Sequence, residues 1–87
     1  MTTKPPPTVK EFPLESLEKI AYDSVRSIPT QEPNDRNRLG YHVWQWLMSR
    51  EGTLAEAIVI SGSRMHISHE EALKIIRENL KKQGIQL

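Results

Sequence analysis

The sequence predicts an all-α protein, a compact domain of four helices preceded by a Pro-rich arm. Apolar residues recur at the three- and four-residue spacing of amphipathic helices. Prolines and glycines interrupt this pattern where helices would end, and two Ser/Thr-x-x-Glu motifs mark helix starts. Because 87 residues suffice for only one small core, we expect a single domain over residues 13–87 and an arm over residues 1–12.

The arm and the first helix meet at Pro13. Residues 1–12 contain three consecutive prolines and few apolar side chains, so we expect them to be disordered. The first helix is predicted over residues 14–28, ending before Pro29. One face of this helix carries its apolar residues, which are Leu14, Leu17, Ile20, Ala21, Val25 and Ile28.

The second helix is predicted over residues 36–50. Asn34 or Asp35 is its expected N-cap, and Gly52 is the expected left-handed residue that closes it. Gly40 lies inside this helix, at a cost of about 1 kcal/mol relative to Ala. The helical period places Val43, Trp44, Leu47 and Met48 toward the core, and places Trp46 on another edge with Leu39, His42 and Arg50.

A capping box formed by Thr53 and Glu56 predicts the start of the third helix, because a hydroxyl at the cap accepts from the third backbone amide. This helix is predicted over residues 54–61 and ends at Gly62. Its last five residues, 57–61, are rich in β-branched side chains, so a short strand stays open as the alternative.

A second capping box, Ser68 with Glu71, predicts the start of the fourth helix. We expect this helix over residues 69–83, ended by Gly84. Taken together, the four helices predict one core, built from Leu17, Ile20, Val25, Val43, Trp44, Leu47, Ile58, Leu73, Ile76 and Leu80.

Composition narrows the possible functions. The net charge is only +1. Residues 36–87 carry eight basic and five acidic side chains, whereas residues 1–35 carry four basic and six acidic side chains. Any attraction to nucleic acid must therefore depend on where the charges lie. The chain has no cysteine and no apolar run near the roughly 20 residues that span a bilayer. We expect a cytoplasmic protein with no membrane partner.

Histidines and serines are the candidates for chemistry. His66 and His69 have a spacing that can place two imidazoles on one metal ion, with Glu70 or His42 as a third ligand. We favour the simpler interpretation, in which His66 belongs to a loop and His69 to a helix start. The spacing of the polar residues does not indicate a catalytic set of nucleophile, general base and orienting carboxylate. The sequence therefore predicts no metal, no cofactor, no small-molecule substrate and no enzymatic activity.

Residues 51–87, "EGTLAEAIVISGSRMHISHEEALKIIRENLKKQGIQL", resemble the helix-turn-helix core of winged-helix domains, without the wing itself. A short helix opened by Gly-Thr is followed by a longer helix opened by Ser68. The resemblance implies that the last helix contacts nucleic acid through its outward residues. The candidate nucleic-acid contacts are Arg64, Lys74, Arg77, Lys81 and Lys82. Our first functional hypothesis is a small nucleic-acid-binding or accessory regulatory protein.

A helical protein-interaction module is the second hypothesis. The charges of the last helix can also form exposed Glu–Lys pairs four residues apart, which need no ligand. In this interpretation a protein partner, or a second copy of the chain, binds at the edge formed by Trp46, His42 and Arg50. The sequence leaves open whether the first helix covers Trp46 instead.

Overall fold

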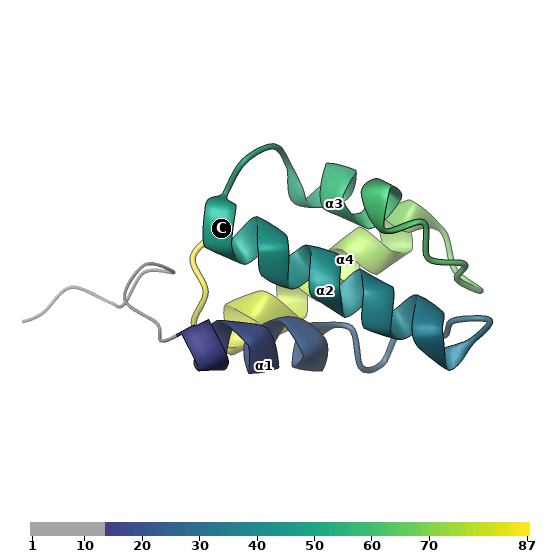
Figure 1. Ribbon diagram of the computed structural model, residues 1–87, viewed down its shortest axis with the longest axis horizontal. Coiled ribbons are helices and arrows are strands. Elements are labelled where there is room, and N and C mark those ends of the chain that lie inside the picture. The colour runs from purple at the N-terminus through teal and green to yellow at the C-terminus, as the bar shows by residue number, and fades with distance from the viewer. Residues whose placement is uncertain (1–13) are drawn as a thin grey trace, which may run out of the picture.

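The computed structural model describes residues 14–87 and contains four helices (Figure 1). The predicted arm, residues 1–12, lies outside the described residues. Within residues 14–87 there is no strand, only an isolated bridge between Thr30 and Met65. The all-α fold class is thus confirmed, with helices α1 (Leu14–Ser24), α2 (Pro33–Ser49), α3 (Leu54–Ser61) and α4 (His69–Lys82).

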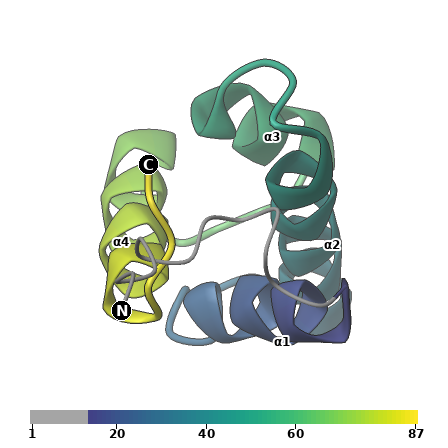
Figure 2. The same cartoon turned by 90° about the vertical axis from the view of Figure 1, so that its left-hand side faces the viewer.

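The four helices surround one core. Viewed end-on, α1, α2, α3 and α4 occupy the four sides of the molecule (Figure 2). Helix α1 packs against α2 and α4, and α3 packs against the same two helices. Every helix therefore turns one apolar face inward. The core consists of Leu17, Ile20, Ala21, Val25, Ile28, Leu39, Val43, Leu47, Leu54, Ile58, Ala72, Ile76, Leu80 and Ile85.

Helix α1 ends at Ser24, four residues earlier than predicted. The Ser24 hydroxyl donates to the Ala21 carbonyl over 2.6 Å, a local bond that competes with continued helix. After Ser24 the chain forms tighter turns, in which a backbone N–H donates to the carbonyl three residues earlier. Val25 N, for example, donates to Tyr22 O at 3.3 Å. Because this turn is tight, Val25 and Ile28 still reach the core.

Helix α2 begins at Pro33, so the predicted start at residue 36 is wrong. Glu32 is the N-cap, and Pro33 takes the first helical position, where a missing N–H costs nothing. Asp35, one of the two predicted caps, is instead the third helical residue. Its Oδ2 accepts from the Glu32 backbone N at 3.1 Å, which is the return bond of a capping box.

The far end of α2 also differs from the prediction. Arg50, not Gly52, takes the left-handed position after the helix, with φ 56° and ψ 20°. Its backbone N donates to Trp46 O at 2.7 Å. Gly52 has a positive φ of 73° as well, and turns the chain into α3. Arg50 is the one residue other than glycine with positive φ among residues 14–87.

The buried stripe of α2 consists of Leu39, Val43 and Leu47, each four residues from the next. The prediction that Leu39 lies away from the core is therefore wrong. Trp44 is only partly buried and packs beside the core, and Met48 is 38% exposed. The stripe faces between α1 and α3, so the two tryptophans flank it on opposite sides. Leu73 of α4 is likewise at the edge of the core.

Helices α3 and α4 follow their predicted signals. Thr53 Oγ1 accepts from Glu56 N at 3.1 Å, and residues 57–61 are helical. Ser68 Oγ accepts from Glu71 N, also at 3.1 Å. Helix α4 ends at Lys82, one residue before the predicted boundary.

The turn after α4 sends the C-terminal tail back along the domain. Gly84, with φ 93°, donates to Lys81 O at 3.0 Å, and Ile85 N donates to Leu80 O at 3.0 Å. These two bonds form a Schellman motif, whose accompanying apolar contact joins Ile85 to the core. The tail consequently runs back along α4 (Figure 2), and its Gln86 O accepts from the side chain of Arg50 at the end of α2.

Candidate binding grooves and the basic face of α4

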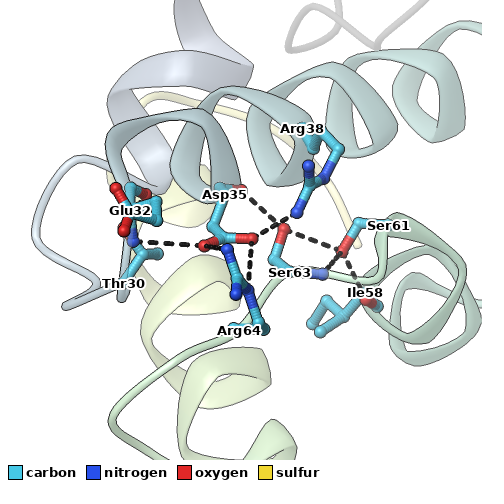
Figure 3. Close-up of polar contacts among 8 residues, drawn as sticks. All are labelled: Thr30, Glu32, Asp35, Arg38, Ile58, Ser61, Ser63 and Arg64. Atoms are coloured by element: carbon cyan, nitrogen blue, oxygen red, sulfur yellow. Dashed lines mark hydrogen bonds and ion pairs between the residues drawn. The ribbon is translucent and has the colours of Figure 1, made fainter.

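A buried carboxylate joins the α3–α4 connection to the start of α2 (Figure 3). Asp35 is fully buried, and its side chain pairs with the guanidinium groups of Arg64, at 3.3 Å, and of Arg38. The Asp35 carbonyl accepts from Ser63 Oγ at 2.5 Å. Next to this cluster, Gln31 N donates to Arg64 O at 2.9 Å. This network fixes the position of the connection.

The charge of Asp35 is set by two opposing effects. Burial raises the pKa of the carboxyl, whereas hydrogen bonds from the backbone and side chain of Arg64, together with the charges of Arg64 and Arg38, lower it. The second effect is larger, and the pKa lies below its ordinary value of 3.8. Asp35 is therefore ionised at neutral pH and acts as an anchor for two arginines.

This arrangement separates Arg64 from the other candidate nucleic-acid contacts. Its side chain is 59% exposed, but its guanidinium is held by Asp35 at the first turn of α2 (Figure 3). Arg64 lines neither of the grooves that involve α4. Its structural partner is thus clear, while its predicted role toward nucleic acid stays a prediction.

An apolar groove of about 280 Å³ lies where the end of α2, the start of α3, α4 and the C-terminal tail meet. We call it the Trp46 groove. Its apolar lining comes from Trp46, Leu54, Leu73 and Leu87, and its basic lining from Arg50 and Arg77; Gly52, Thr53 and Ala55 complete it. The Schellman turn after α4 builds one wall, because it brings Leu87, 43% exposed, to this position.

Trp46 is fixed within the groove by polar contacts. Its Nε1 donates to Gly52 O at 3.1 Å, and the guanidinium carbon of Arg50 lies 4.7 Å from the centre of its ring. The Arg50 guanidinium also donates to Gln86 O in the tail. Arg50 therefore links the end of α2 to the tail while keeping the left-handed backbone that glycine usually adopts.

Trp46 also lines a second groove, of about 310 Å³, between α2 and α3. This His42 groove contains His42, Gln45, Ser49, Glu51, Thr53, Glu56, Ala57 and Ile60. The three predicted partner-binding residues, Trp46, His42 and Arg50, are thus brought to two adjoining grooves. No described residue of α1 lines either groove, so α1 does not cover this edge.

The outer face of α4 carries the predicted basic residues. Lys74, Arg77 and Lys81 line a shallow groove of about 300 Å³ together with Glu70 and Glu78, and Lys82 is exposed nearby in the last turn. Both ion pairs among residues 14–87 end on Asp35, so the expected Glu–Lys pairs along α4 are not formed. Arg77 lines the Trp46 groove as well, and connects the two.

Two apolar residues of α3 that the sequence pattern did not single out are exposed to solvent. Val59 is 59% exposed and Ile60 is 67% exposed. Ile60 lies at the border of the His42 groove. The sequence does contain the signal, because a helix with four apolar residues in succession cannot bury all of them on one face.

The histidines do not form the metal site that their spacing raised as an alternative. Among residues 14–87, no three His, Asp or Glu side chains assemble into a group able to hold a metal ion. His66 belongs to the connection before α4, where its N donates to Pro29 O at 2.9 Å. None of the described helices combines the length and apolar character needed to cross a bilayer.

Comparison with known proteins gives no match: no family model, no curated protein and no solved structure is similar to this chain at the level that identifies a relative.

Proposed function

We propose that this protein is a non-enzymatic protein-interaction module whose partner docks in the Trp46 groove. The observation that supports it most is the convergence of four elements on one open apolar surface. Helices α2, α3 and α4 and the C-terminal tail all contribute to it. A tryptophan and an arginine, the residue types that dominate interface energies, lie in contact within it.

The contacts that hold Trp46 and Arg50 in place support a docking role for the groove. Trp46 is held by Gly52 O, and Arg50 is held by both the tryptophan ring and the tail. A preformed surface loses little side-chain entropy when a partner binds. Arg50 in addition keeps a strained backbone conformation at the groove rim, a feature that concentrates at functional positions.

Selection of peptides on the whole chain tests this function. Random 12-residue peptides displayed on phage are selected against the wild-type chain, and the enriched peptides are measured against two variants. Leu87→Asp places a charge in the groove, whereas Met48→Asp alters a similarly exposed residue that lines none of the grooves described here. We expect Leu87→Asp to weaken binding about tenfold or more and Met48→Asp to leave it unchanged. Equal binding to both variants would reject the groove.

The basic face of α4 supports a second candidate function, nucleic-acid binding. Lys74, Arg77, Lys81 and Lys82 are exposed and form no ion pair with any carboxylate of residues 14–87, so their charges are available to phosphates. The carboxylates of Glu70 and Glu78 in the same groove oppose such contacts. We therefore place this function second.

A shift assay tests the nucleic-acid candidate. Mixed-sequence duplex and single-stranded DNA are titrated at about 50 and 200 mM salt. If α4 binds phosphates, Lys74→Glu with Arg77→Glu abolishes the shift, and affinity falls steeply with salt. Lys19→Glu with Arg26→Glu, on and just after α1, is the charge-matched control. Absence of binding at the lower salt concentration rejects this candidate.

A further inference from the structure

The two arginines of the Trp46 groove carry information about its ligand. Arg50 and Arg77 come from opposite sides, one from the end of α2 and the other from α4. Neither pairs with a carboxylate, because both ion pairs within residues 14–87 involve Asp35. Their charges are consequently unneutralised at the border of an apolar surface.

The neighbouring surface strengthens this positive charge. Arg77 also lines the shallow groove on the outer face of α4, where Lys74 and Lys81 lie. The two connected grooves together contain four basic side chains against two acidic ones, Glu70 and Glu78. A ligand that spans the apolar floor and this rim therefore gains from negative charge.

The geometry of Trp46 favours a polypeptide over a single-stranded nucleic acid in this groove. Nucleic-acid bases bind such platforms by stacking on an exposed aromatic face. Here Arg50 already lies over the Trp46 ring at 4.7 Å. Leu54, Leu73 and Leu87 line the same groove, and they suit an aliphatic or aromatic side chain of a partner.

We propose that the Trp46 groove recognises a partner segment in which a large apolar side chain is flanked by Asp or Glu. The apolar side chain enters between Trp46 and the leucines, and the carboxylates meet Arg77 and Arg50. This inference rests on the proposed docking function, and adds the charge of the partner to it. Bidentate pairing of guanidinium with carboxylate supplies the selectivity.

Three labelled peptides test the charge requirement. Each contains the same central Phe-x-x-Leu, flanked by Glu, Gln or Lys, and binding to the whole chain is followed by fluorescence anisotropy. We expect the Glu peptide to bind about three- to tenfold more tightly than the Gln peptide, and the Lys peptide to bind most weakly. A Glu-rich peptide without Phe and Leu serves as the control for charge alone.

Two variants attribute the preference to the groove. Arg77→Glu should abolish the preference for the Glu peptide over the Lys peptide, because it leaves three basic against three acidic side chains in the two grooves. Arg26→Glu, after α1, should preserve the preference. Arg50→Asn should reduce the preference, because Asn tolerates the left-handed backbone but lacks the charge.

The remaining outcomes separate the two proposals. Equal binding of the Glu and Gln peptides overturns the acidic requirement and leaves the docking function standing. Failure of all three peptides to bind at millimolar concentration, with no peptide enriched in the phage selection, overturns both. Equal binding of the peptide without Phe and Leu, or equal competition by single-stranded DNA, overturns recognition of an acidic apolar segment in favour of unselective anion binding.

Discussion

Replacing Asp35 with Asn lowers the Tm by roughly 10 °C, since the neutral amide forms weaker hydrogen bonds with the two arginines than the buried carboxylate does. Asp35 is fully buried and neutralises Arg64 and Arg38, and it also accepts from the Glu32 backbone. Its loss therefore loosens both the start of α2 and the connection before α4. Thermal unfolding followed by circular dichroism at pH 7 measures the effect.

The pH dependence of the Tm difference between wild type and Asp35→Asn shows whether the charge of Asp35 causes it. Because the folded pKa of Asp35 is lower than its ordinary value of 3.8, the stability it contributes is fully present above that value. That stability is lost as the pH falls through the folded pKa. The Tm gap between wild type and Asp35→Asn should stay constant from pH 7 to about 4 and shrink below it. A gap that widens in acid contradicts the ion-pair account.

Replacing Gly40 with Ala destabilises the domain by about 1–2 kcal/mol, although Ala is the better helix former. A Cβ at Gly40 would lie 2.5 Å from Cδ1 and 2.8 Å from Cε1 of the Tyr22 ring, where α1 crosses α2. The ring must shift, and this cost exceeds the gain in helix propensity of about 1 kcal/mol. Denaturant unfolding measures the difference.

A double-mutant cycle attributes the effect to the contact with Tyr22. In the background of Tyr22→Ala, the substitution of Gly40 by Ala no longer meets the ring and should stabilise the domain by up to about 1 kcal/mol. The same destabilisation in both backgrounds would show that Tyr22 is not the cause.

The ends of α3 and α4 could be predicted because their signals are local. Thr53 and Ser68 each bond the backbone three residues ahead, and Gly62 and Gly84 supply positive φ next to the helix ends. The start of α2 was mispredicted because Asp35 suits both a cap and a third helical position. Its partner Arg64 is 29 residues away, and no local pattern reveals that contact.

The candidate site was predictable in part. The helical period placed Trp44 in the core and Trp46 outside it, whereas both tryptophans are partly buried and pack beside the core. It also misassigned Leu39, because it gave the core face of α2 the wrong rotation. Leu87 could not be connected to Trp46 from sequence, since its position depends on the Schellman turn at Gly84 and on burial of Ile85. The lining of the groove therefore depends on tertiary packing, which the local sequence does not reveal.

The indole N–H signals of the two tryptophans test the docking function most directly. Trp46 Nε1 bonds Gly52 O inside the groove, whereas the buried Trp44 Nε1 has no acceptor among the described residues and lines none of the grooves described here. A peptide enriched by selection is titrated into the ¹⁵N-labelled chain. The account predicts that the Trp46 signal shifts and saturates while the Trp44 signal stays in place. A shift of Trp44 with Trp46 unchanged, or changes confined to α1, would contradict it.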